Sequence, residues 1–190
     1  IVFFSSDNGT THLPKEVGIQ FFQSVGPLRG LKGSLYEGGI RVPMLVRWPG
    51  KIPAGTTTDH ISAFWDILPT MAELVGLEAP AGIDGISFAP TLLGRAQEQK
   101  QHEYLYWEFP GYGGQLAVRM GPWKGVIRNL HSKGGRIGAQ WELYNLKKDI
   151  GEQQNLAHLH PEIVEKIEQI VEQAHKPNPL FPMIPLDRVK

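Results

Sequence analysis

The stretches IVFFSSDNG (residues 1–9) and LRGLKGSLYEGGIRVP (residues 28–43) decide how this chain is interpreted. The first is a short apolar run, typical of a buried strand, that ends in the oxygen-bearing side chains of Asp7 and Asn8. The second is a glycine-punctuated loop that presents Lys32. In open α/β sheets, ligands bind beyond the carboxyl ends of the strands. We therefore expect the two stretches to form one half of a site for a metal ion and an anion.

Two interpretations of the Asp-Asn-Gly sequence are open. On its own it is most often a tight turn, because Asn and Gly adopt positive φ at little cost. Alternatively, Asp7 and Asn8 are hard oxygen ligands for Ca²⁺ or Mg²⁺. Because Ca²⁺ takes roughly six to eight oxygens, these two residues would supply only part of the set.

Lys32 stands between Gly30 and Gly33, so its backbone can approach an anion closely. The alternative is an ordinary exposed loop lysine. The segment does not fit the Walker pattern, which argues against a nucleotide. Glu37 and Arg41 lie four residues apart, and we interpret them as structural residues that place the lysine loop.

These segments resemble the later half of sulfatases of the arylsulfatase type, in the alkaline-phosphatase-like superfamily. The resemblance continues through WPG (residues 48–50), DILPT (66–70), DGIS (84–87), AVRMGPWK (117–124) and LYNL (143–146). It implies that Asp7 and Asn8 bind the metal and that Lys32 binds the sulfate. It also implies that the parent protein hydrolyses sulfate esters with a formylglycine nucleophile.

The nucleophile is expected outside this chain. The family makes formylglycine from Cys or Ser in a Cys/Ser-x-Pro/Ala-x-Arg motif, and the chain has no cysteine. The nearest serine form, SVGPLR (residues 24–29), has one residue too many before proline. Because residue 1 already lies inside an apolar run, we expect the chain to be a fragment of a longer protein that is inactive alone. The exposed strand edge should lead either to self-association or to disorder of the first third of the chain.

Composition excludes several classes of protein. With 19 basic and 19 acidic residues, the chain lacks the positive charge of a nucleic-acid binder. No apolar stretch approaches the roughly 18 residues of a membrane span. A periplasmic, secreted or lysosomal location of the parent is implied only by the resemblance.

Candidate substrate contacts are weaker. His12 follows the Asp-Asn-Gly turn and could reach the pocket, although a solvated loop histidine is the simpler alternative. Trp107, Glu108 and Tyr112 combine aromatic faces with a carboxylate, as carbohydrate subsites do, but aromatic residues on strands are more often core. A sulfated small molecule or glycan as substrate is implied by the resemblance.

The expected fold is α/β, or α+β for the fragment alone. Residues 1–95 should be the later part of an α/β core, with a strand at 42–48, a helix capped by Asp66, and a helical turn at 88–93. Residues 96–176 should form a small antiparallel sheet and a helix that begins at Pro161, and 177–190 a proline-rich tail without regular structure. The expected strands are 102–109, 115–120, 123–128 and 140–146.

Two other functions stay open at this stage. One is a phosphodiesterase or phosphonate hydrolase of the same superfamily, although an Asp-Asn pair followed by a lysine suits a sulfatase with one metal ion better. The other is a noncatalytic binding module, because the chain alone lacks a nucleophile and half of its metal ligands.

Overall fold

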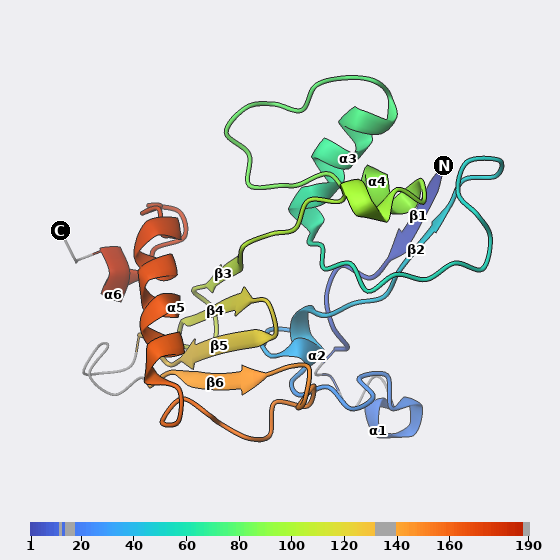
Figure 1. Cartoon of the computed structure of the whole chain (residues 1–190). Helices are drawn as coiled ribbons and strands as arrows, with labels where there is room; N and C mark the ends of the chain where they lie inside the picture. The colour runs from blue at the N-terminus through green and yellow to red at the C-terminus, as the bar shows by residue number, and fades with distance from the viewer. Residues whose placement is uncertain (12, 14–17, 132–139, 188–190) are drawn as a thin grey trace. The chain divides into compact units, whose positions relative to one another are not determined.

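The chain folds into two compact units (Figure 1). The computed structural model describes residues 1–11, 13, 18–131 and 140–187. The first unit, here called the helical unit, comprises residues 1–5 and 43–103, and the second, the sheet unit, comprises residues 6–42 and 104–190. Residues 6–42 therefore group with the antiparallel sheet rather than with residues 43–95. The domain division of the whole protein at residues 95 and 96 stays a prediction.

A two-stranded ribbon and several short helices make up the helical unit (Figure 1). Strand β1 (Val2–Ser5) pairs antiparallel with β2 (Met44–Arg47). The helical elements are η1 (Phe64–Asp66), α3 (Ile67–Leu74), α4 (Ala89–Leu92) and η2 (Ala96–Glu98). Helix α3 and the turn α4 confirm the two helical predictions in this region.

Strand β1 is not the fully buried strand that its apolar sequence predicts. Val2 and Phe4 are 61% and 68% exposed, and Leu45 opposite Phe4 is 60% exposed. Phe3 points to the other face and packs edge-on against Phe88, with ring centroids 6.4 Å apart. The strand expected at 42–48 is present as β2, but only one face of the ribbon is covered, so β2 is not a buried core strand in this chain. Self-association through the ribbon stays a prediction.

Asp66 is a polar centre of the helical unit rather than the side-chain cap of α3 that we expected. Its buried carboxylate accepts hydrogen bonds from the backbone N–H groups of Ala63 (2.7 Å) and Ile86 (2.8 Å). His102 Nε2 lies 2.9 Å from Asp66 Oδ1. The carboxylate thus joins three segments of the unit, and the helix start has no side-chain cap.

The sheet unit contains a four-stranded antiparallel sheet in the order β3-β4-β5-β6. The strands are β3 (Leu105–Phe109), β4 (Gln115–Met120), β5 (Trp123–Arg128) and β6 (Glu142–Asn145). The predicted limits of β4 and β5 are confirmed, whereas β3 and β6 are shorter than predicted.

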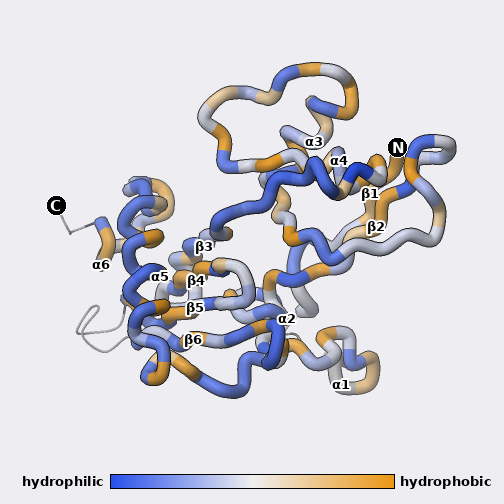
Figure 2. Tube along the Cα trace, viewed as in Figure 1, coloured by the Kyte–Doolittle hydropathy of each residue, from blue (hydrophilic) through white to orange (hydrophobic). Residues whose placement is uncertain are grey.

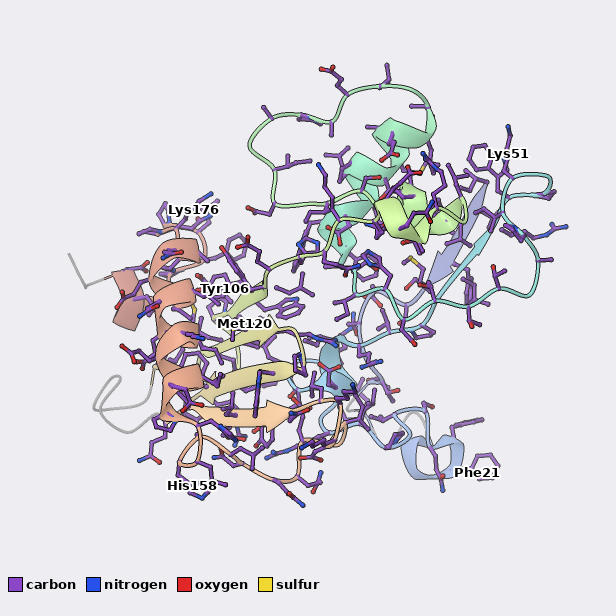
Figure 3. All side chains as sticks on the ribbon, in the orientation of Figure 1. Phe21, Lys51, Tyr106, Met120, His158 and Lys176 are labelled. Atoms are coloured by element: carbon purple, nitrogen blue, oxygen red, sulfur yellow. The ribbon has the colours of Figure 1, made fainter. Side chains whose placement is uncertain are left out.

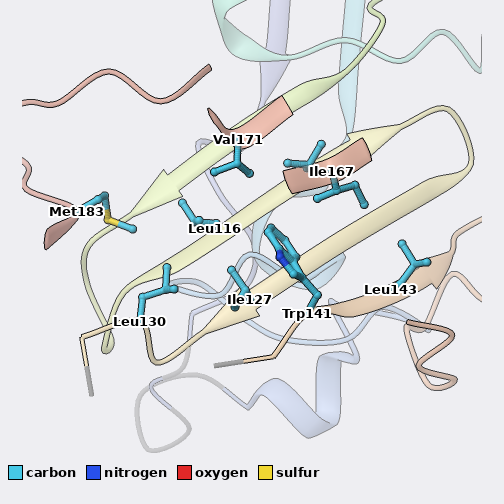
Figure 4. Packing of buried hydrophobic residues seen from close by; sticks show 9 residues of the cluster. Leu116, Ile127, Leu130, Trp141, Leu143, Ile167, Val171 and Met183 are labelled. Carbon is cyan, nitrogen blue, oxygen red and sulfur yellow. The ribbon is translucent and has the colours of Figure 1, made fainter. Parts of the chain in front are cut away.

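One face of this sheet packs against helix α5 (Pro161–Ala174), as Figure 4 shows. Ile167 and Val171 of the predicted apolar stripe are fully buried there, while polar residues alternate with apolar ones along the rest of the helix (Figure 2). The buried cluster consists of Leu116, Val118, Ile127, Leu130, Trp141, Leu143, Ile167, Val171 and Met183. The predicted α5 is therefore confirmed as the cover of this face.

The opposite face of the sheet carries the glycine-rich loop. Leu35 and Tyr36, just before the short helix α2 (Glu37–Ile40), are buried in a second cluster with Ala117, Val126, Tyr144 and Leu146. Successive strand residues point to opposite faces, so each strand contributes to both clusters. This packing fixes the lysine loop on the sheet.

The expectation that residues 177–190 lack regular structure is wrong for part of the tail. A helical turn, α6 (Ile184–Asp187), forms after Met183, which is fully buried in the α5 cluster. Asp187 Oδ2 accepts a hydrogen bond from Met183 N at 2.9 Å, and Asp187 Oδ1 lies 2.9 Å from His175 Nε2. One buried side chain and two polar contacts thus hold the turn. No helix in the described part of the chain, including the short α1 (Ile19–Phe22), is long and apolar enough to cross a bilayer.

Candidate functional site

The two stretches that the sequence singles out meet in the sheet unit. Gly9 N donates a hydrogen bond to Gly39 O at 2.9 Å, and Lys32 N donates one to Thr10 O at 2.8 Å. The Asp-Asn-Gly turn and the residue after it are therefore joined by backbone hydrogen bonds to two points of the lysine loop, Gly39 and Lys32. The expected convergence of the two loops is seen at the level of the main chain.

The contact between these loops requires glycine. A Cβ at Gly9 would lie 1.9 Å from Gly38 O and 2.8 Å from Gly39 Cα, distances that real Cβ atoms do not show. Gly33, next to Lys32, has a φ of +87°, which favours glycine. The glycines thus serve close approach and a special backbone conformation beside the candidate site residues.

Asp7 and Asn8 fit the donor chemistry of a hard cation. Asn8 Nδ2 donates a hydrogen bond to Asp7 Oδ2, which orients the two side chains relative to each other. No donor among the described residues bonds to the other carboxylate oxygen of Asp7 or to the amide oxygen of Asn8. As far as the described residues go, these two hard oxygens accept no hydrogen bond, and oxygens of this kind suit a hard cation. The described residues contain no group of three or more His, Asp or Glu side chains that could hold a metal.

Gln115 at the start of β4 fastens the lysine loop to the sheet. Its Nε2 donates to Gly33 O at 2.9 Å, and its Oε1 accepts from Leu35 N at 3.3 Å. One buried amide thus holds the backbone on both sides of Ser34. The Lys32 side chain remains exposed. The loop therefore presents a solvent-facing cation from a fixed backbone.

Tyr112 is the aromatic residue that the structure brings next to this loop. An added Cβ on Gly33 would lie 2.7 Å from Tyr112 Cε2, so the ring rests directly over Gly33. The side chain is 64% exposed, and its ring centroid is 5.8 Å from that of Phe109. Tyr112 also has a φ of +51°, an uncommon conformation for a bulky residue. It forms an exposed aromatic surface beside Lys32.

Trp107 and Glu108, two other predicted substrate contacts, do not both lie on the face of the sheet that carries the lysine loop. Trp107 packs beside the buried cluster on the loop face of the sheet. Glu108 points to the α5 face, where its carboxylate accepts a hydrogen bond from the Tyr106 hydroxyl and lies 2.7 Å from His175 Nδ1. Glu108 therefore does not share the loop face with Trp107, because neighbouring strand residues face opposite sides, and its role as a substrate contact stays a prediction. His12 lies outside the described residues.

A buried ionic network supports the lysine loop from the sheet side. Lys124 Nζ on β5 lies 2.8 Å from Glu37 Oε1 and 3.1 Å from Glu152 Oε1. Burial alone would raise the pKa of Glu37, but the Lys124 ammonium, together with Arg119 and Arg41, holds that pKa below its usual value. Arg41 Nη1, 3.2 Å from Glu37 Oε2, confirms that Glu37 and Arg41 act as a structural pair. Sequence reasoning missed Lys124 and Glu152.

A second polar cluster lies further along the same face. Arg29 donates to the Tyr144 hydroxyl and to Glu152 O, both at 2.8 Å, and its guanidinium lies 3.9 Å from the Tyr36 ring centroid. Burial and a hydrogen bond to Glu142 raise the pKa of Tyr144 to about 12. Glu142 also accepts from the Tyr36 hydroxyl at 2.6 Å. The segment before Lys32 is thus held by charge-assisted contacts.

Comparison with known proteins finds similarity along most of the chain. The family described as "N-sulphoglucosamine sulphohydrolase, C-terminal" matches residues 31–177. A protein of Formosa agariphila named sulfatase is 35% identical over 174 residues, covering 85% of this chain and 29% of that protein. Human arylsulfatase A is 33% identical over 190 residues, covering 90% of this chain and 36% of that protein.

A solved structure from work on the metabolism of multiple glycosaminoglycans by Bacteroides thetaiotaomicron has a similar fold. It superposes with a TM-score of 0.73 at 27% identity, covering 91% of this chain and 38% of that one. The chain therefore spans about a third of the length of these two relatives and of this structure's chain.

Proposed function

Because the chain belongs to the sulfatase family, we propose that the whole protein hydrolyses sulfate esters and that residues 7–41 form one side of its active site. The observation that carries this proposal is the backbone junction of the two loops, Gly9 N to Gly39 O and Lys32 N to Thr10 O. The junction joins the backbones of the two loops that carry the Asp7 carboxylate, the Asn8 amide and the Lys32 ammonium group. These are the groups that a sulfate bound to a metal ion requires.

Asp7 and Asn8 would hold a Ca²⁺ or Mg²⁺ ion through the oxygens that accept no hydrogen bond from the described residues. The bound ion supplies positive charge to the sulfate oxygens. The remaining ligands, and the formylglycine that the family uses, would come from parts of the whole protein outside this chain. We therefore expect the 190-residue chain alone to bind Ca²⁺ weakly and to have no activity.

Lys32 would bind the sulfate oxygens through its ammonium group. The sulfate oxygens are negatively charged in the transition state, so a cation beside them can stabilise that state and orient the ester. Gln115 and the bond to Thr10 keep the Lys32 backbone from moving. The ammonium need not be held by other side chains before the substrate arrives.

We propose a sulfated glycan as the substrate class. Tyr112 offers an exposed aromatic face beside Lys32, and sugar rings stack on such faces. The similarity to the Bacteroides structure from glycosaminoglycan metabolism supports this class. Tyr112→Ala should raise KM for a sulfated disaccharide more than for a small aryl sulfate, whereas equal changes for both would argue against a sugar contact.

The decisive experiment replaces Lys32 by alanine in the whole protein. Loss of a donor to a transition-state oxyanion commonly costs about 10²–10³ in kcat. We expect at least about 10²-fold loss on an aryl sulfate. Lys51→Ala is a matched control, because Lys51 is an exposed lysine on the turn after β2 (Figure 3). Turnover by Lys32→Ala at the level of this control would remove Lys32 from the site.

The same assay separates the proposed activity from its nearest rival. The unmodified protein is compared on an aryl sulfate and on the corresponding aryl phosphate mono- and diesters. We expect a higher kcat/KM on the sulfate. A preference for a phosphate ester would favour a phosphodiesterase or phosphonate hydrolase, and no activity on any ester would favour a binding module.

A further inference from the structure

Lys124 is completely buried, which is unusual for a lysine and requires compensation. Its ammonium lies between two buried carboxylates, 2.8 Å from Glu37 Oε1 and 3.1 Å from Glu152 Oε1. Removing one partner of such a group leaves an uncompensated charge in the interior. The two glutamates come from different segments, one on the lysine loop and the other after β6.

The two carboxylates play different parts. Glu37 Oε1 accepts a hydrogen bond from Lys124, and Arg41 binds the other oxygen. Glu152 Oε2 accepts a hydrogen bond from Glu37 N at 2.7 Å. Glu152 Oε1 faces Lys124 at 3.1 Å but has no hydrogen bond of good geometry among the described residues. Burial raises the pKa of Glu152 in spite of the nearby ammonium. The Lys124 ammonium thus binds Glu37 more strongly, while Glu152 holds the Glu37 backbone.

Glu37 lies directly before the two glycines on which the candidate site rests. Gly39 O accepts the hydrogen bond from Gly9 N, and Gly38 O limits how close Gly9 can come. Gly38 N in turn donates to Arg29 O at 2.6 Å, just before the turn that leads to Lys32. A shift of Glu37 would therefore move both loops.

We propose that Lys124 and Glu152 are positioning residues for the metal- and sulfate-binding loops, and that both act through Glu37. This inference rests on the proposed function, because it assigns to the network the placement of Asp7, Asn8 and Lys32. Buried ion pairs add little net stability compared with well-packed apolar residues. The effect of the network is therefore on geometry rather than on net stability, because it holds the helical turn α2 in one position over the sheet.

The test uses Lys124→Met and Glu152→Gln in the whole protein, with Ca²⁺ alone as the binding probe. Changes in residues that orient metal ligands typically cost about 10–100-fold in metal affinity or activity. We expect a loss in that range in Ca²⁺ affinity, measured by calorimetric titration, and in kcat/KM for an aryl sulfate. If Lys124→Met does not fold, Glu152→Gln, which keeps the shape of the side chain, provides the result.

Glu168→Gln is the matched control. Glu168 accepts a hydrogen bond from Trp141 Nε1 at 3.2 Å on the α5 face of the same sheet, away from the loops. This change should leave Ca²⁺ affinity and kcat/KM unaltered. A purely structural role of Lys124 would lower the melting temperature while the folded protein keeps normal Ca²⁺ affinity, and that result would overturn the proposal.

A double-mutant cycle gives a second readout. If Lys124 acts by placing Lys32, the loss in kcat/KM caused by Lys124→Met should shrink when Lys32 is already alanine, because coupled residues are not additive. Fully additive losses would overturn the proposal. Failure of the proposed function looks different: Lys32→Ala alone would then leave sulfate ester hydrolysis unchanged.

Discussion

Replacing Gly9 by alanine is the sharpest structural test of the junction between the two loops. The added methyl group would lie 1.9 Å from Gly38 O, whereas Cβ atoms essentially never approach closer than 3.0 Å. The turn must therefore move by at least about 1.1 Å, the difference between these two distances. A misplacement of about 1 Å can cost about 10²-fold in rate. The 2.9 Å hydrogen bond from Gly9 N to Gly39 O would also weaken, at a net cost of about 0.5–1.5 kcal/mol.

The assay compares Gly9→Ala with Gly18→Ala in the whole protein. Neither glycine has a φ in the left-handed region, but the nearest atom to an added Cβ at Gly18 is 3.4 Å away, an ordinary contact. We expect Gly18→Ala to stay within about twofold of the unmodified protein in kcat/KM. Gly9→Ala should lose about 10²-fold, with a parallel loss of Ca²⁺ affinity. Equal activity of the two variants would refute the reasoning that this close contact places Asp7 and Asn8.

Three further predictions concern stability and are checked by chemical denaturation. Asp66→Asn should cost about 1–3 kcal/mol, because an amide cannot accept all the hydrogen bonds that the buried carboxylate accepts. Ile167→Ala should cost about 2–5 kcal/mol through a cavity under α5, and the partly buried Ile170→Ala should cost less. Burial would raise the pKa of Glu142, but hydrogen bonds from two tyrosines and Arg128 hold that pKa below its usual value of 4.5. Its contribution to stability is therefore present above about pH 4.5 and lost as the pH falls through the lowered pKa, so Glu142→Gln should flatten the acid dependence. An unchanged acid slope in this variant would count against that assignment.

The first and last residues of β4 and β5 could be predicted correctly, because the apolar runs and the turn between them all indicate the same hairpin. An apolar run stands on each side of the Gly121-Pro122 turn, and the hairpin needs no distant partner to define it. Lys124 shows the opposite case. A lysine in a strand is normally expected to face solvent, but here its partner Glu37 lies 87 residues away in the sequence. Only the packing of the loop onto the sheet reveals that the lysine is buried.

The contact between the two loops could be predicted from local signals, whereas the roles of the site residues stay predictions. The residues around Asp7 and Lys32 could be brought together because each segment has its own chemical signature. Glu108 was grouped with Trp107 by composition, although strict alternation along β3 already separates them onto two faces. The exposure of Phe4 could not be predicted, because the sequence of an apolar strand does not indicate which of its two faces other elements will cover.

The joining of residues 6–42 to the sheet unit has a consequence for biosynthesis. The backbone of Glu37 binds a side chain that follows 115 residues later, so the ribosome must make the whole intervening stretch before this bond can close. At a translation rate of roughly 5–20 residues per second, Glu152 is added on the order of 6–23 seconds after Glu37. Strands β4 and β5, on which Leu35 and Tyr36 pack, are made before Glu152, so the glycine-rich segment can dock on the sheet before its last buried polar contact closes.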